Sequence, residues 1–244
     1  VQYWLYLQRV VQGDLGTSFI SGVDVIDMVK ARFPNTVRLA FLATIVSAFF
    51  GISMGLLSAL KRETFIDYLL TVIALLGISI PIFWLGLMLI YLLSVEMSLL
   101  PIAGAATWKH YIMPVCTLSM VSIASILRIT RSSILEVMSE DFVRSARAKG
   151  LRESLVVFQH VLPNALIPVV TVIGLQFGYM LGGSIITETI FGWPGMGRML
   201  VVAVNQRDVM VVQGVLIVIA SSCVFVNLIV DIVYATVAPK RSYS

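Results

Sequence analysis

Five apolar segments, each long enough to cross a lipid bilayer, constrain the fold of this chain more than any other feature. They span residues 37–60, 68–93, 111–135, 165–190 and 210–237. A membrane helix needs about 20 consecutive, mostly apolar residues, and in lipid every backbone N–H and C=O must find its partner inside the protein. The sequence therefore predicts an all-α, polytopic membrane protein with five membrane helices.

Composition agrees with this fold class and argues against several functions. The chain is 59% hydrophobic and 12% charged, whereas soluble domains are about 45–50% apolar and about 25% charged. The net charge of +4 is spread over loops without a dense basic patch, which argues against nucleic-acid binding. The sequence contains no G-x4-G-K-[ST] phosphate loop, so we expect that this chain is not an enzyme and hydrolyses no ATP. Cys116 and Cys223 lie in apolar runs, which favours neither a disulfide scaffold nor a metal site.

A polar stretch, residues 136–164, separates the third and fourth apolar segments. Its pattern predicts a helix over 142–149 that Gly150 ends, followed by a helix over 153–161 that Pro163 stops. Small residues on the first helix lie among basic ones, a shape suited to a groove on another protein. The same pattern also fits a solvated loop whose basic residues only set the membrane topology.

The distribution of lysine and arginine orients the chain. If residues 136–164 lie inside, the inner loops and span ends hold Lys61, Arg62, Arg128, Arg131, Arg144, Arg147, Lys149, Arg152, Lys240 and Arg241. The outer loops hold Lys109, Arg198 and Arg207, and the long first segment holds Arg9, Lys30, Arg32 and Arg38. With that first segment left aside, the split satisfies the positive-inside rule. We therefore expect residues 1–36 to form an external segment with short amphipathic helices, residues 37–237 to form the transmembrane domain, and residues 238–244 to form a cytoplasmic tail.

Small residues recur every four positions in two of the apolar segments. The positions are Gly51 and Gly55 in the first segment, and Gly174, Gly178 and Gly182 in the fourth. Such stripes let helix backbones approach closely, where lipid provides no hydrophobic drive for association. We expect these glycines to pack helices rather than to contact a substrate.

The polar stretch resembles a loop of ABC importer permeases. The residues Arg144-Ser145-Ala146, then Gly150, then His160-x-Leu162-Pro163 are similar to the family pattern E-A-A-x3-G-x9-I-x-L-P, with departures at Arg144, Ser145 and His160. The runs A-R-A-K-G-L and L-P-N-A-L-I-P resemble the dipeptide/oligopeptide/nickel branch. In that family the loop is the coupling helix, which sits in a cleft of a cytoplasmic ATPase. The resemblance implies that coupling involves Arg144, Ser145, Ala146, Lys149, Gly150, Leu151, His160, Leu162 and Pro163.

A second resemblance lies before the last apolar segment. Residues 187–198 resemble the E-x-x-F-x-x-P-G-x-G segment of peptide-class permeases, and the resemblance implies that this segment lines the external mouth of the pathway. The matching residues are Glu188, Phe191, Pro194, Gly195 and Gly197. From position alone, we expect Glu188 to reach a membrane interface and Trp193 to be an interfacial anchor. The runs G-D-L-G-x-S and R-F-P-N-T-V-R-L-A near the N-terminus continue the likeness.

Together these resemblances imply a type I ABC importer permease with a MetI-like helix bundle, in which a first membrane helix precedes the present residue 1. The implied partners are a second permease subunit in a heterodimer, two cytoplasmic ATPase subunits, an external solute-binding protein and membrane lipid. ATP and Mg would be bound by the ATPases, with no cofactor in this chain. The implied location is a bacterial-type plasma (inner) membrane with the C-terminus in the cytoplasm.

The implied cargo is a di- or oligopeptide, and a nickel ion or metal chelate is the alternative. An ion-coupled secondary transporter is a further alternative from the residues alone. Such transporters place ionisable residues near the bilayer midplane and contain internal repeats, and neither feature is evident in this sequence. A membrane enzyme is a weaker alternative, because the predicted topology puts His110 and His160 on opposite sides of the membrane.

Overall fold

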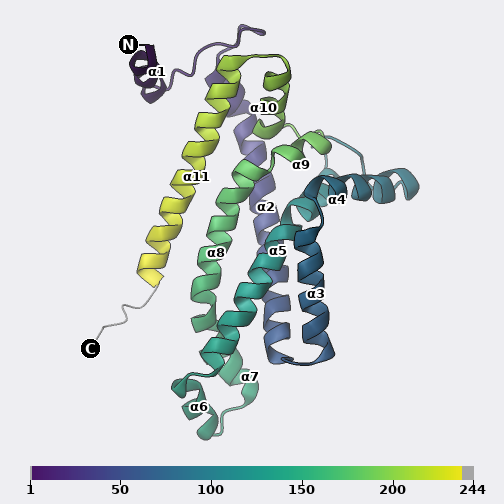
Figure 1. Cartoon of the computed structure of the whole chain (residues 1–244), viewed down its shortest axis with the longest axis vertical. Helices are drawn as coiled ribbons and strands as arrows, with labels where there is room; N and C mark the ends of the chain where they lie inside the picture. The colour runs from purple at the N-terminus through teal and green to yellow at the C-terminus, as the bar shows by residue number, and fades with distance from the viewer. Residues whose placement is uncertain (1, 238–244) are drawn as a thin grey trace. The chain divides into compact units, whose positions relative to one another are not determined.

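The structure, a computed structural model, describes residues 2–237. Side-chain surroundings are described for residues 4 and 8–232. The expected cytoplasmic tail, residues 238–244 with Lys240 and Arg241, lies outside the described residues. Within them the regular structure is helical (Figure 1), apart from an isolated bridge between Thr17 and Asp24.

Most connections between helices are short, and the longest are residues 12–24 and 97–108. In chain order the helices are α1 (Gln2–Val11), α2 (Val25–Leu60), α3 (Phe65–Ser79), α4 (Ile82–Leu89), the π-helix η1 (Ile90–Glu96), α5 (Lys109–Met138), α6 (Asp141–Ala148), α7 (Glu153–Leu155), the π-helix η2 (Val156–Val161), α8 (Leu162–Gly183), α9 (Ile185–Ile190), α10 (Met196–Asn205) and α11 (Val209–Val237). Among the described residues, four helical stretches are long and apolar enough to cross a membrane, or five if α3 and α4–η1 form one broken span.

Helix α2 begins well before the first predicted span. Residues 25–36, part of the segment in which short amphipathic helices were expected, are continuous with that span, although Pro34 lies inside the helix. Val25 and Val29 are buried in a hydrophobic cluster with side chains of α10 and α11, so tertiary packing extends the helix beyond its apolar run.

The second predicted span, 68–93, is interrupted rather than kinked. Helix α3 ends at Ser79 and α4 starts at Ile82, and Ile80 between them is extended, with φ −77° and ψ 122°. The ring of Pro81 clashes with a helical conformation of the preceding residue, which pushes Ile80 into the extended region. Pro81 within this apolar run predicts a bend in the helix, whereas the structure has a full loss of helix at this point.

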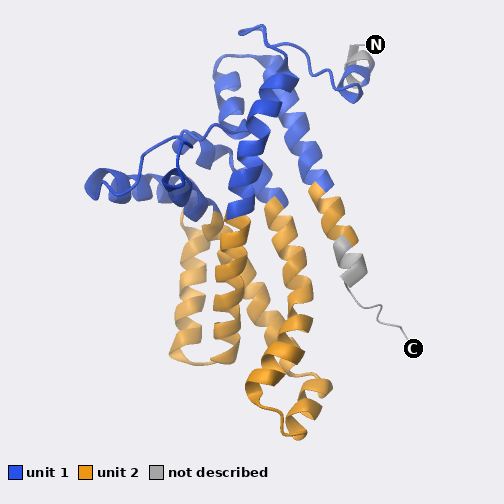
Figure 2. Cartoon of the chain, turned by 180° about the vertical axis from the view of Figure 1, so that it is seen from behind, with its two compact units in different colours: residues 1–42, 82–118, 178–225 blue, residues 43–81, 119–177, 226–244 orange. Residues whose placement is uncertain are grey.

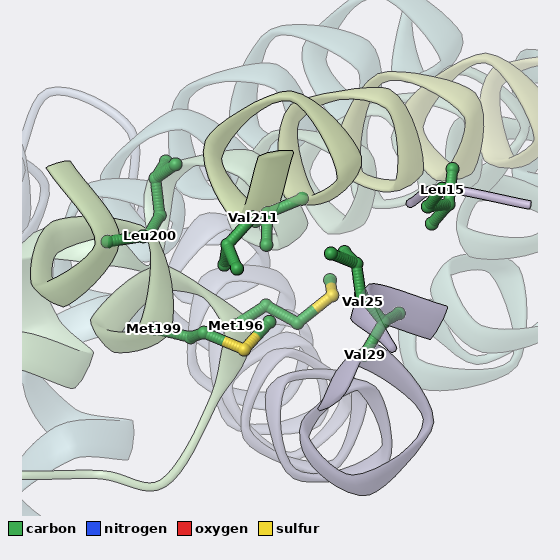
Figure 3. Close-up of a cluster of buried hydrophobic side chains, with 9 residues drawn as sticks. Leu15, Val25, Val29, Met196, Met199, Leu200 and Val211 are labelled. Carbon is green, nitrogen blue, oxygen red and sulfur yellow. The ribbon is translucent and has the colours of Figure 1, made fainter. Parts of the chain in front are cut away.

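The described chain divides into two compact units, which Figure 2 colours separately. Among the described residues, unit 1 contains residues 2–42, 82–118 and 178–225, and unit 2 contains residues 43–81, 119–177 and 226–237. The core of unit 1 is drawn in Figure 3, where side chains from the start of α2, from α10 and from the start of α11 meet. Its labelled members are Leu15, Val25, Val29, Met196, Met199, Leu200 and Val211. Fully burying a side chain of this kind contributes about 1.5–3 kcal/mol.

Unit 2 is organised by close contacts between α2, α3 and α5. A Cβ atom added at Gly51 would lie 2.7 Å from Ile126, and one added at Gly55 would lie 2.6 Å from Thr130. These glycines therefore allow the backbone of α2 to approach α5 more closely than any larger residue would. On the neighbouring surface, α3 packs Leu70 and Ala74 against Ala124 and Leu127 of α5.

Candidate functional site: a basic helical hairpin and a buried loop anchor

The polar stretch folds as a helical hairpin in unit 2, at the ends where α5 stops and α8 starts (Figure 1). Helix α6 is capped by Lys149, and Gly150 then adopts φ +77°, a conformation that favours glycine. Arg147 bridges the turn and donates from Nε and Nη2 to the carboxylate of Glu153, at 3.1 Å and 2.6 Å. The hydrogen bonds of Glu153 raise the pKa of Arg147 above its ordinary value. A two-pronged ion pair thus holds α6 against α7.

One face of α6 is bound to the membrane helices of unit 2. Val143 and Ala146 are buried in a cluster that draws on the ends of α2 and α5 and on the start of α8. The other buried members of this cluster are Ala59, Ile134, Val156, Val161 and Ala165. Because protein interiors are close-packed and transmit strain, a displacement of α6 acts directly on the ends of three long helices.

The opposite face of the hairpin is exposed and carries both charge and apolar surface. Arg144, Ser145, Ala148, Lys149 and Gly150 are exposed. Four large apolar side chains lie on the same hairpin and are 39–59% exposed, namely Phe142, Leu151, Leu155 and Phe158. This mixture of cationic and apolar groups is typical of a surface that binds another protein rather than of a purely solvated loop.

A second cluster is built around Glu188 in unit 1. This carboxylate is fully buried. It accepts hydrogen bonds from Thr36 Oγ1 at 2.7 Å, from Ser184 Oγ at 3.0 Å and from the backbone N–H of Arg198 at 3.1 Å. Thr36 Oγ1 in turn accepts the N–H of Met196 at 2.8 Å. The buried charge therefore joins α2, α9 and the start of α10 through donors that satisfy it.

The glycines of the same segment make room for this carboxylate. A Cβ atom at Gly195 would collide with the carboxylate of Glu188, and one at Gly197 would lie 2.6 Å from the Cα of Ile185. Beside them, Trp193 is buried, donates from Nε1 to the Asn35 carbonyl at 3.1 Å and packs edge-on against Tyr111. The segment is thus a rigid loop fixed to α2.

Comparison with known proteins identifies the family. Residues 51–243 match the family described as binding-protein-dependent transport system inner membrane component. The glutathione transport system permease protein GsiC of Escherichia coli O6:H1 is 45% identical over 242 residues, which covers 99% of this chain and 79% of that protein. The chain belongs to this family of transporter permeases. It is an inner-membrane permease component of a binding-protein-dependent ABC importer.

Further relatives agree with this assignment. The GsiC protein of Salmonella paratyphi A is 44% identical over 243 residues, covering 100% of the permease and 79% of that protein. Among solved structures, an inward-facing MetNI methionine ABC transporter aligns with a TM-score of 0.75 at 17% identity, covering 87% of the permease and 97% of that chain. An amino acid ABC transporter aligns with a TM-score of 0.65 at 19% identity, covering 86% and 94%. These structures confirm the type I permease fold that the sequence predicts.

The structure distributes the nine expected coupling residues of the permease unevenly. Arg144, Ser145, Lys149, Gly150, Leu151 and Pro163 are exposed, and His160 and Leu162 are half-buried. Ala146 is 7% exposed and belongs to the hydrophobic cluster that packs α6 against α2, α5 and α8. It is therefore not on the exposed face of α6 that would enter a groove on another protein. Helix periodicity alone did not reveal which side of α6 faces the bundle.

Pro163 does not end the second helix of the hairpin. The chain continues from α7 through η2 into α8, and Pro163 is the second residue of α8. A proline ring in a helix meets the carbonyl of the residue four positions earlier, which is Gln159 in η2. The wider π-helical turn relieves that clash. The predicted helix stop is therefore a change of helix type.

Two expectations for the loop at 187–198 are wrong. Glu188 does not reach an interface, and Trp193 is not an interfacial anchor, because both side chains have no exposed surface. Their polar atoms are satisfied by the loop and by α2. Phe191 is also buried, at 2% exposed. Hydropathy placed these residues at the end of a span, whereas tertiary hydrogen bonding buried them.

The run G-D-L-G-x-S has a structural partner that the sequence alone did not reveal. Ser18, in the run G-D-L-G-x-S, donates a hydrogen bond to Asp208, which also accepts the N–H of Phe19 at 3.3 Å. Burial raises the pKa of Asp208, but these hydrogen bonds outweigh it, so that the pKa lies below its ordinary value. A Cβ atom added at Gly16 would lie 3.3 Å from Met210, and one added at Gly214 would lie 2.5 Å from Val25.

Sequence reasoning missed a buried ion pair in unit 2. Asp67, in the first turn of α3, accepts Nε and Nη2 of Arg131 from α5 at 2.8 Å and 2.7 Å. Both residues lie at the ends of predicted spans, where hydropathy averaging conceals a single charge. A useful signal was available, because an acidic and a basic residue at matching ends of neighbouring spans are able to pair.

Proposed function

We propose that this permease imports a di- or oligopeptide type of substrate and that ATP-driven motion enters it through the hairpin at residues 139–163. The observation that carries the proposal is the two-faced α6. Its inner face is locked to the ends of three long helices, and its outer face presents cationic and apolar side chains without cover.

The outer face suits a cleft on a cytoplasmic ATPase subunit. Phe142 and Phe158 offer apolar anchors. Lys149 and Arg152 offer charges that steer an encounter with an acidic rim, whereas Arg144 Nη1 lies 3.5 Å from Oδ1 of Asp141 within the hairpin. Two such ATPases would bind and hydrolyse ATP with Mg, and this chain would supply no catalytic group. The hairpin and the C-terminus would then both lie in the cytoplasm, as the distribution of basic residues favours.

The remaining partners follow from the same proposal. A second permease subunit would complete the pathway as a heterodimer, and an external solute-binding protein would deliver cargo near the loop at 187–198. The rigid anchoring of that loop to α2 through Glu188 and Trp193 supports a fixed docking platform. The loop would move together with α2 and not independently of it.

A peptide-type cargo is supported by the relatives, which are named as glutathione permeases. Glutathione is a tripeptide, so it belongs to the same chemical class as short peptides. A nickel ion or metal chelate is the alternative cargo that the resemblance to the wider branch implies. Uptake competition in cells separates the two, because unlabelled short peptides compete only with a peptide-type cargo.

Co-purification with an ATPase assay tests the coupling proposal. Gly150→Asp places a charge at an exposed position with φ +77° and no neighbour within 4 Å, and Gly13→Asp does the same at φ +83° in the N-terminal segment. We expect Gly150→Asp to abolish transport and binding-protein-stimulated ATPase activity, with normal membrane insertion, and Gly13→Asp to retain both. Full activity of Gly150→Asp would refute docking through the hairpin.

A further inference from the structure

An open cavity of about 360 Å³ lies on unit 2 between the start of α3 and the middle of α5. Its lining residues are Asp67, Tyr68, Thr71, Leu127, Arg128 and Arg131. This cavity has its own set of polar groups. It is not part of the hairpin at residues 139–163, of the glycine contacts or of the loop around Glu188.

The floor of the cavity is held rigidly by Asp67. This carboxylate is 3% exposed and accepts two hydrogen bonds from Arg131, one from Ser58 Oγ and one from the N–H of Glu63 at 3.0 Å. Charge-assisted, two-pronged pairs of this kind are strong and geometrically specific. The pair neutralises Arg131 and fixes the position of its guanidinium group.

Because Arg131 is neutralised, Arg128 provides the one remaining positive charge in the cavity. It lies close to one turn before Arg131 on α5, is exposed, and forms no ion pair with the part of the chain that the structure describes. Arginine binds phosphate and carboxylate through a planar set of donors. The cavity therefore offers one cationic site, and Tyr68, which is 63% exposed, also lines it.

The surroundings of the cavity change from polar to apolar along α3. On one side, the turn at residues 61–64 is exposed and carries Lys61, Arg62 and Glu63. On the other side, Val72, Leu75 and Leu76 are 50–55% exposed. These three residues follow Tyr68 by four, seven and eight positions, so they continue its face of the helix. The cationic cavity lies at the boundary between a polar surface and an apolar stripe.

A cationic cavity next to an apolar stripe is complementary to an amphiphile with one negative charge. We infer that the cavity binds the phosphodiester headgroup of an anionic phospholipid such as phosphatidylglycerol, with Arg128 on the phosphate and an acyl chain along Val72, Leu75 and Leu76. Basic pockets between membrane helices are established sites for anionic headgroups. A free phosphate ion would use Arg128 but not the apolar stripe, so the stripe favours a lipid.

Lipid retention tests this inference directly. The permease is co-expressed with its partner subunits, purified in mild detergent from membranes containing phosphatidylglycerol, and the retained phospholipids are counted by mass spectrometry. The variants are Arg128→Gln, Arg128→Lys and, as a matched loss of one exposed charge at the first residue of α5, Lys109→Gln. Arg128 is exposed, so its replacement leaves the packing of α5 unchanged.

We expect Arg128→Gln to lower the affinity for added phosphatidylglycerol roughly five- to tenfold, the effect of one arginine near a lipid phosphate. Arg128→Lys should retain part of the binding, and Lys109→Gln should match the unaltered protein. Val72→Asn, on the apolar stripe, should also weaken retention. Equal retention by all variants would overturn the site. Competition by inorganic phosphate as effective as that by phosphatidylglycerol would overturn the lipid as its occupant.

Discussion

Thr36 and Glu188 are 152 residues apart in the chain, and the hydroxyl of the first donates to the carboxylate of the second at 2.7 Å inside unit 1. This bond connects two segments that resemble peptide permeases separately, the run R-F-P-N-T and the run E-x-x-F-x-x-P-G-x-G. The hydrogen bond between them gives a physical reason why both segments resemble the peptide-permease branch. One segment supplies the donor and the other supplies the buried acceptor and the glycines that surround it.

Replacement of Glu188 tests this anchor. Glu188→Ala leaves the donors of Thr36, Ser184 and Arg198 without their acceptor, and we expect the free energy of unfolding to fall by about 1–3 kcal/mol for each buried group left unsatisfied. Glu188→Gln retains one acceptor oxygen and should cost less. Thermal unfolding in detergent measures both. If the alanine variant unfolds at the temperature of the unaltered protein, the carboxylate does not hold the loop.

Glycine packing in unit 2 gives a second prediction, with an internal control. Gly51→Ala would place a methyl group 2.7 Å from Ile126, whereas at Gly182 in unit 1 the nearest atom, on Ile219, lies at an ordinary contact distance of 3.7 Å. We expect Gly51→Ala to destabilise the permease by about 1–3 kcal/mol through overpacking, and Gly182→Ala to have little effect. Equal unfolding temperatures for the two variants would contradict this account of the stripe.

The Arg147–Glu153 pair predicts a charge-reversal rescue. Arg147→Glu places two carboxylates across the turn of the hairpin, and we expect a loss of binding-protein-stimulated ATPase activity. The double variant with Glu153→Arg restores the pair and should recover most of the activity. The contribution to stability is small, about 0.2–1 kcal/mol for an exposed pair, so coupling is the informative measurement. Failure of the double variant would assign Arg147 to direct contact with the partner.

The bond between Ser18 and Asp208 predicts a pH dependence. The pKa of Asp208 lies below its ordinary value, near 3.9 in the unfolded chain. Its stabilising contribution is therefore fully present above that pH and is lost as the pH falls through the lower folded-state pKa. The difference in unfolding temperature between the unaltered protein and Asp208→Asn should be constant from about pH 8 to about pH 5. It should shrink below about pH 4, and a difference that is unchanged at low pH would exclude this role.

Local chemistry made part of the site predictable. Gly150 sits where α6 ends because a left-handed residue follows a helix at little cost for glycine, and this depends only on neighbouring residues. The exposed basic residues of the hairpin were also evident, since a charged stretch between membrane spans cannot be buried in lipid. The inward orientation of Ala146 was not evident, because it depends on contacts with Ala59 and Ile134 from other helices.

The sequence by itself determined the class of this protein. Apolar runs long enough to span a bilayer require helices, and the coupling-loop pattern indicated an ABC importer permease, which the family match confirms. Tertiary structure alone decided which charges are buried. Glu188, Asp67 and Asp208 each lie close to the end of an apolar run, where hydropathy favours exposure. Each is buried because donors from distant segments, Thr36, Arg131 and Ser18, offset the cost of removing its charge from water.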